Sequence, residues 1–195
     1  MSTRDDILAR VRRNQPAPVA LPAIPRFATA PAPSIEQFTE AVLRMGGKVV
    51  ERPQDGDLTR LVRTLFPQAA VIASATGEVA GNRELTSGAG PAGLADVDVG
   101  VVRAVFGVTE TGSVWLTSAQ FKVNSLGFLA QHLVVLLDPA SLVGSMHDAY
   151  ALRDCFDTGY GVFMTGPSAT ADIEGILIHG AQGIRSLTII PVAAG

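Results

Sequence analysis

Short apolar runs alternate with helical segments from residue 34 onward, and this alternation restricts the fold more than any other feature. The runs at 70–74, 131–138 and 186–192 are apolar on both faces. Strands of this kind are typical of a parallel sheet that is covered on both sides. The sequence therefore predicts an α/β fold with an open, mostly parallel sheet sandwiched by helices.

The periodicity also predicts where the individual elements lie. Helices are expected over 3–14, 34–47, 57–66, 145–156 and 168–180. Strands are expected over 48–51, 70–74, 96–108, 113–117, 131–138, 162–165 and 186–192. The second helix has Ser34 as its N-cap, with Gln37 in the capping-box position, and it closes at a pair of glycines.

Residues 1–33 form a segment of different character. A short helix with Ile7, Leu8 and Val11 on one face precedes a segment that holds six of the twelve prolines. Proline at this density favours an extended linker, and so short a helix is not stable alone. We expect an N-terminal arm over 1–33 that docks on its own domain, a second copy or a partner, and an α/β domain over 34–195.

Composition excludes several function classes. The net charge is −3 and the arginines are scattered, so nucleic acid is not an expected partner. The start of the chain does not resemble a signal peptide, and no apolar run approaches the roughly 20 residues of a membrane span. Cys155 is the only cysteine. A reduced, cytoplasmic location is therefore expected, and the chain has too few cysteines for an iron–sulfur cluster, which typically needs about four.

Other familiar motifs are absent or lack their context. The glycines of 88–93 match a dinucleotide fingerprint, but no strand precedes them and no helix follows, so a loop is predicted. His132, His147 and His179 lack metal-ligand spacing, so no metal site is expected, and His132 is interpreted as a hydrogen-bonded histidine at a strand start. Cys155, in an amphipathic helix, is interpreted as an inert buried thiol.

A turn between two expected strands carries the first candidate site. Glu110 lies in it, flanked by Thr109, Thr111, Gly112 and Ser113. A carboxylate fixed by neighbouring hydroxyls suits a nucleophile or a general base. The competing interpretation is an ordinary turn in which the glycine supplies a positive φ and the hydroxyls bond the local backbone.

The second candidate site is the segment that begins with Gly166 and Pro167. Ser168 and Thr170 follow as possible helix caps, and Asp172 lies in the expected first turn. One interpretation is a helix cap with acids that complement the dipole. The other is a helix start whose free N–H groups bind an anion.

Together the two segments resemble the LUD-domain family, typified by the protein C subunits of lactate utilization. The resemblance rests on Glu110-Thr-Gly-Ser113 before an apolar strand, and on Gly166-Pro-Ser-Ala-Thr-Ala-Asp-Ile-Glu174 near the C-terminus. It implies a fold similar to that of sugar isomerases and CoA transferases. It also implies membership of a three-part system that oxidises L-lactate to pyruvate, with iron–sulfur clusters on the two partner proteins and no cofactor on this chain.

The resemblance implies that the two segments lie on facing sides of a single binding site. The expected ligand-binding residues are those of the two motifs (Thr109, Thr111, Gly112, Ser113, Gly166, Pro167, Ser168, Thr170 and Asp172), with Glu110 as the candidate catalytic residue. A lactate site needs an arginine for the carboxylate, and Arg103 is the nearest candidate in sequence.

Three hypotheses remain open at this point. In the first, the chain is a subunit without iron–sulfur clusters that binds a small anion or docks its iron–sulfur partners. In the second, it is a stand-alone enzyme of the CoA-transferase or sugar-isomerase type that uses Glu110 as nucleophile or base. In the third, it is a regulatory or structural module with a vestigial pocket. Assembly into a homo-oligomer is possible under each.

Overall fold

The computed structural model describes residues 2–20, 22–23, 25, 32–86, 90–167, 169–172, 174–179 and 181–193. Within this part of the chain the largest sheet has five parallel strands, ordered β1-β11-β6-β3-β2. Their bounds are β1 Lys48–Val49, β2 Ile72–Ser74, β3 Val99–Arg103, β6 His132–Leu137 and β11 Ser186–Pro191. The predicted α/β fold with a mostly parallel central sheet is confirmed.

A second, four-stranded sheet packs against this first one, in the order β7-β4-β5-β8. It consists of β4 Phe106–Val108, β5 Ser113–Thr117, β7 Leu142–Val143 and β8 Gly161–Met164, and its β4–β5 and β5–β8 pairs are antiparallel. The expected single strand over 96–108 is therefore wrong. Between Arg103 and Phe106 the chain leaves the first sheet and enters the second.

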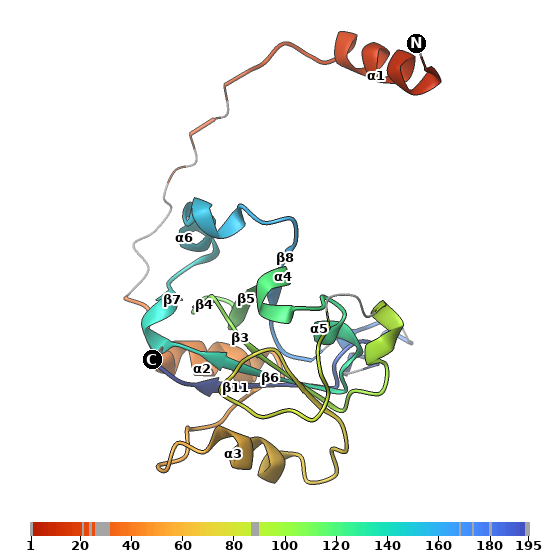
Figure 1. The fold of residues 1–195 in the computed structure, drawn as a ribbon. Helices are drawn as coiled ribbons and strands as arrows, with labels where there is room; N and C mark the ends of the chain where they lie inside the picture. Colours follow the sequence, from red (N-terminus) through yellow and green to blue (C-terminus); the bar gives the residue numbers. More distant parts are fainter. Residues whose placement is uncertain are drawn as a thin grey trace.

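Helices cover the outer faces and fill the space between the sheets (Figure 1). The helix α3 Leu58–Leu65 packs on one face of the first sheet, through Leu58 and Val62. On its other face lie α2 Ile35–Arg44, the inner side of the second sheet, and the short helices α4 Ser118–Phe121 and α5 Leu126–Leu129. The outer side of the second sheet packs against α6 Met146–Ala151 and the 3-10 turn Arg153–Phe156 that follows it.

Alternation along single strands explains this layering. In β6, Leu133, Val135 and Leu137 face the α2 side, whereas Val134 and Leu136 face α3. All five side chains are buried. At roughly 1.5–3 kcal/mol for each fully buried aliphatic side chain, such two-sided burial is the main stabilising contribution of a central strand.

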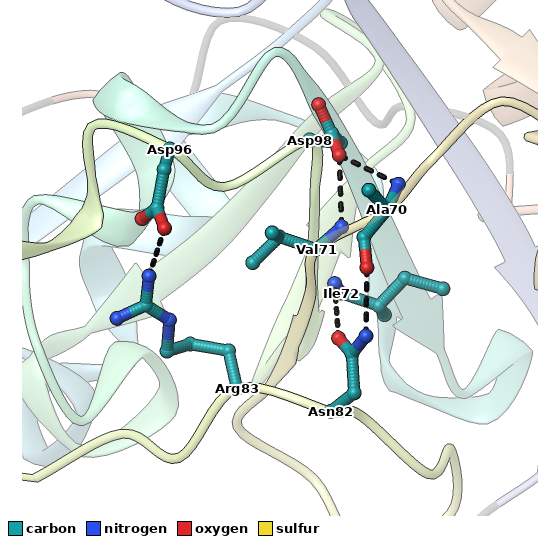
Figure 2. A network of polar contacts seen from close by, with 7 residues as sticks. All are labelled: Ala70, Val71, Ile72, Asn82, Arg83, Asp96 and Asp98. Carbon is teal, nitrogen blue, oxygen red and sulfur yellow. Dashed lines mark hydrogen bonds and ion pairs between the residues drawn. The ribbon is translucent and has the colours of Figure 1, made fainter.

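Polar side chains finish the edge of the first sheet at β2 (Figure 2). The Asn82 side chain accepts from Ile72 N (2.7 Å) and donates to the Ala70 carbonyl (2.7 Å), as the backbone of a neighbouring strand would. Asp98 accepts from Ala70 N and Val71 N, both at 2.8 Å, and Arg83 pairs with Asp96. These side chains bond backbone groups at the exposed edge of the sheet, and this limits the pairing of that edge with a strand of another chain.

The helix predicted over 168–180 is wrong. The described residues there form a hairpin of β9 Ala169–Thr170 and β10 Ile178–His179, paired antiparallel. Glu174 (φ 55°) and Gly175 (φ 71°) adopt left-handed backbone between the strands, and the Thr170 hydroxyl bonds Asp172 N in a local turn. Local side-chain bonds and a glycine in mid-segment outweigh the apolar periodicity.

The N-terminal helix α1 Thr3–Arg13 is present as predicted, with a Ser2–Asp5 capping box. None of its residues is buried, and Figure 1 shows it apart from the two sheets. The predicted helix at 145–156 is shorter than expected, because α6 ends at Ala151. Among the described residues, no helix combines the length and the apolar character that crossing a membrane requires.

Candidate functional site

The Glu110 turn connects β4 to β5 and is held from both sides. The Gly112 N–H donates to the Val108 carbonyl (2.9 Å), which closes the turn, and Gly112 has a φ of +64°. A Cβ at Gly112 would lie 2.5 Å from Val42 N on α2. Glycine is therefore required here twice, for its backbone conformation and for the close approach of the helix.

On its other side the turn is bound to the segment that leads into α6. Thr109 N and its hydroxyl both donate to the Val143 carbonyl (2.9 Å each), and Glu110 N donates to Gly144 O (3.1 Å). The Glu110 carboxylate is exposed, and its Oε2 accepts from Met146 N at 2.9 Å, in the first turn of α6. Glu110 is thus a fixed carboxylate that also supplies a partner for a free helix N–H.

Three hydroxyl side chains surround the turn. The Thr111 hydroxyl donates to Ser113 Oγ (2.7 Å), and the Thr165 hydroxyl donates to the Thr111 carbonyl (3.2 Å). Thr165 directly precedes the second motif. The structure therefore brings the start of that motif next to the Glu110 turn.

Gly166 and Pro167 pack on the C-terminal end of α2. Gly166 has a φ of +61°, and a side chain there would overlap the Met45 carbonyl. Pro167 is buried, with its ring 3.3 Å from where a Cβ of Gly46 would lie. These two residues fix the position of α2 relative to the second sheet.

The other described residues predicted for the second motif, Thr170 and Asp172, form hydrogen bonds with each other. Ser168 lies outside the described residues. Thr170 and Asp172 belong to the hairpin region, where the Thr170 hydroxyl donates to Asp172 Oδ2 (2.9 Å). The described part of this segment forms a hairpin and no helix, so it does not supply the helix N-terminus on which the anion site was predicted, and ligand binding by Thr170 and Asp172 stays a prediction.

A depression of about 400 Å³ opens where α2, the Glu110 turn and α6 meet. Its lining residues are Ala41, Arg44, Met45, Glu110, Thr111, Ser113, Met146 and Thr165. Glu110, Thr111 and Ser113 were predicted from the sequence; the side chains from α2 and α6 were not. The available signal was weak, namely an arginine in the last turn of a helix that ends in a double glycine.

Arg103, the sequence-based candidate for binding a carboxylate, has other partners. Its Nε donates to Glu78 Oε1 (2.5 Å), its Nη2 pairs with Glu78 Oε2, and its Nη1 donates to the Val192 carbonyl (3.1 Å). The bonds from Arg103 hold the pKa of Glu78 below its usual value, and the same contact raises the pKa of Arg103. Arg44 instead lines the depression.

His132 is confirmed as a hydrogen-bonded histidine at the start of β6. Its Nδ1 lies 2.7 Å from Ser186 Oγ, and its ring centroid is 4.8 Å from that of Phe66. Burial, with smaller contributions from the charges of Arg185 and Lys48, lowers the pKa of His132. Within the described ranges, no group of three or more His, Cys, Asp or Glu residues is arranged to hold a metal ion.

The arrangement can bind a small molecule that has both an acidic and a hydrogen-bonding group. The lining includes the guanidinium-bearing Arg44 and the anchored carboxylate of Glu110, and Ala41, Met45 and Met146 add apolar surface. Sites of this kind bind ligands mainly through apolar contact and use a few polar groups to fix orientation.

Comparison with known proteins identifies relatives of known sequence. The chain is similar to lactate utilization protein C of Geobacillus sp. strain WCH70, with 27% identity over 168 residues that cover 80% of this chain and 67% of the relative. It is also similar to the uncharacterized protein YkgG of Escherichia coli K12, with 34% identity over 92 residues (44% and 39% of the two chains). An uncharacterized protein of Neisseria meningitidis, NMB1437, is 30% identical over 100 residues (50% and 43%). The chain thus spans about two thirds of the first relative and less than half of the other two.

The fold has a counterpart among solved structures. The crystal structure of a DUF162 family protein from Deinococcus radiodurans superimposes with a TM-score of 0.62 at 16% identity, covering 82% of this chain and 96% of that one. The family model for the LUD domain matches residues 92–192, just over half of the chain, and includes both motif segments. The chain therefore belongs to the LUD-domain family.

Proposed function

We propose that this chain acts in lactate utilization, as the subunit without iron–sulfur clusters of a system that oxidises L-lactate to pyruvate. Similarity to a protein named lactate utilization protein C over 80% of the chain supports the metabolic context. The observation that carries a ligand-binding role is the depression beside Glu110, because residues of the first family motif line it together with Thr165, which directly precedes the second motif.

Electron flow makes the proposed role dependent on partners. Oxidation of lactate to pyruvate removes two electrons and two protons. A chain with a single cysteine cannot ligate an iron–sulfur cluster of its own. In the proposed system the electrons therefore pass to two iron–sulfur partner proteins, and this chain binds the small acid or holds the partners in place.

The N-terminal arm is the proposed docking element for those partners. Ile7 and Val11 are 56% and 54% exposed, so α1 presents an apolar face that no described residue covers. Residues 1–33 contain five arginines and two aspartates, a net charge of +3, whereas residues 34–195 contain ten basic and sixteen acidic residues, a net charge of −6. The arm therefore differs in charge from the domain that it extends.

One feature of the site favours a second candidate function. Glu110 is exposed and lines the depression, and its Oε1 accepts no hydrogen bond from any described residue, whereas its Oε2 accepts from Met146 N. Such a carboxylate suits a nucleophile or base in a stand-alone enzyme similar to CoA transferases or sugar isomerases. This alternative predicts turnover by the isolated chain.

The first experiment is purification of tagged full-length protein from its own cells grown on L-lactate. Iron and acid-labile sulfide are measured in the eluate, together with lactate-dependent reduction of an artificial electron acceptor. The same measurements are made on Glu110→Gln, on a chain lacking 1–33, and on Arg63→Gln, an exposed α3 residue used as the matched control.

The subunit proposal expects iron–sulfur proteins and lactate-dependent reduction in the wild-type and Arg63→Gln eluates. It expects that the chain lacking 1–33 loses both the co-purifying iron–sulfur proteins and the lactate-dependent reduction. It expects that Glu110→Gln keeps the iron–sulfur proteins and loses only the reduction. An iron-free eluate that never reduces the acceptor would refute the proposal. If that iron-free chain transfers acyl groups or isomerises a sugar phosphate, and Glu110→Gln does not, the stand-alone enzyme is the correct function.

A further inference from the structure

We infer that Arg44 is the carboxylate-binding residue of the depression, and that the ligand is a small 2-hydroxy acid whose hydroxyl donates to Glu110. The inference rests on the proposed function, because it names the ligand class and the orientation at that same site. It also replaces Arg103, whose guanidinium is already paired with Glu78.

Arg44 is available for a ligand. It is exposed, lines the depression and forms no ion pair with any described residue. By contrast, Arg60, Arg83 and Arg103 are all paired with carboxylates. An arginine guanidinium offers two parallel N–H donors that match the two oxygens of a carboxylate.

The position of Arg44 is fixed by the fold. It is the last residue of α2, and Gly112 and Gly166 hold that end of the helix through close backbone contacts. The negative end of the helix dipole favours a cation at this position. Ala41 and Met45 line the depression with Arg44, and this apolar surface strengthens the attraction between its guanidinium and an anion.

Glu110, which also lines the depression, selects a hydrogen-bond donor. Glu110 by itself repels an anion, so Arg44 is needed to make the depression attractive to an acid. Because Oε2 of Glu110 already accepts from Met146 N, Oε1 is the oxygen that remains for a ligand. A hydroxyl next to the carboxylate of the ligand satisfies both residues at once, and a small apolar substituent contacts Met45 and Met146.

Ligand titrations of the full-length protein test the two contacts separately. Binding of L-lactate, propionate, pyruvate and L-alanine is measured by calorimetry for the wild type, Arg44→Gln, Arg44→Lys, Glu110→Gln and the control Arg63→Gln. Propionate and pyruvate lack the hydroxyl, whereas L-alanine carries an ammonium in its place. Because Arg44 is exposed, thermal unfolding of its variants is expected to match that of the wild type, which excludes misfolding as a cause.

The expected pattern distinguishes the roles of the two residues. Arg44→Gln weakens L-lactate and propionate alike, by roughly 10- to 100-fold, since a charge-assisted pair is lost. Arg44→Lys keeps the positive charge but lacks the two parallel N–H donors of a guanidinium, so its affinity is expected to lie between those of Arg44→Gln and the wild type. Glu110→Gln weakens L-lactate more than propionate, and Arg63→Gln changes nothing.

Three results would overturn the inference. Unchanged lactate affinity in Arg44→Gln would exclude Arg44 while leaving the partner-dependent function in place. Tighter binding of L-alanine than of L-lactate would show that the site takes amino acids. If no acid binds the wild type although iron–sulfur proteins co-purify with it, the depression is not a ligand site and the chain serves only to dock its partners.

Discussion

Gly112 and Gly166 show at the scale of single residues why the two family motifs contain glycine. Each has a positive φ, and each lies so close to the backbone of α2 that a side chain would clash with it. The glycines therefore hold the helix in place, and in the proposed site the contacts with a ligand are assigned to Glu110 and Arg44. The sequence predicted the need for glycine in the turn, but the contact with α2 links positions 70 residues apart and was not predictable.

Replacement of Gly112 by alanine is expected to destabilise the protein by more than about 2 kcal/mol. The new Cβ meets α2 backbone at 2.5 Å and the left-handed conformation is strained. The free energy of unfolding from urea titration measures the loss. The control is Gly77→Ala, where a Cβ meets nothing within 4 Å. Equal stability of the two variants would contradict the packing argument.

The Glu78–Arg103 pair predicts a pH-dependent contribution to stability. The pKa of Glu78 is lowered from 4.5 by the Arg103 hydrogen bonds, so its contribution is fully present above pH 4.5 and is lost as the pH falls through the lower folded-state pKa. Because the pair is partly exposed, Glu78→Gln is expected to cost only about 0.5–1 kcal/mol at pH 7. The difference between wild type and variant should shrink in unfolding titrations as the pH falls through the lowered folded-state pKa, and it should vanish once Glu78 is protonated in both the folded and unfolded states. A difference that does not shrink as the pH falls below 4.5 would mean that packing, not charge, is lost.

At the scale of elements, the segment 168–180 is the clearest failure of prediction from sequence. Its apolar residues fit a helix, yet Ile176 and Leu177 are 61% and 59% exposed and the described residues of the segment form a hairpin. Thr170, Asp172 and Gly175 each favour a turn locally, and no apolar surface covers the face that a helix would have had to bury. Periodicity indicates a helix only where tertiary packing provides a partner for the apolar face.

The β2 edge gives a prediction at the same scale. Asn82→Ala removes the two 2.7 Å bonds to the backbone of Ala70 and Ile72 and exposes their polar groups at the sheet edge (Figure 2). We expect a loss of about 1–2 kcal/mol in unfolding free energy and a greater tendency to associate. Light scattering and urea unfolding measure the two effects. Glu84→Ala, an exposed neighbour, is the control and should change neither.

At the scale of the whole molecule, α2 lies between the two sheets, and the candidate site forms at its C-terminal end. Phe38 and Val42 of α2 are fully buried in the core between the sheets. In contrast, α1 of the N-terminal arm has no buried residue. Stability and docking are therefore expected to reside in different parts of the chain.

Deletion of residues 1–33 tests this separation. Since no α1 residue is buried, the melting temperature of the truncated chain should stay within about 2 °C of that of the full-length protein. Calorimetry at equal protein concentration measures this. A large fall in melting temperature would mean that the arm packs on the domain, in its own chain or in a second copy, and concentration dependence of the fall would identify the second copy.

The sequence by itself determined the α/β class, the central strands, the capped α2 helix, the position of Glu110 in a tight turn and the likeness to the LUD-domain family. Each of these depends on residues close together in the chain, through burial period, capping and turn chemistry. Only the tertiary structure decided that 96–108 is divided between two sheets, that the described residues of 168–180 form a hairpin, and that Arg44 rather than Arg103 lines the depression. Those outcomes depend on which distant surfaces are available for packing and which charged groups already have partners, and neither can be deduced from local pattern.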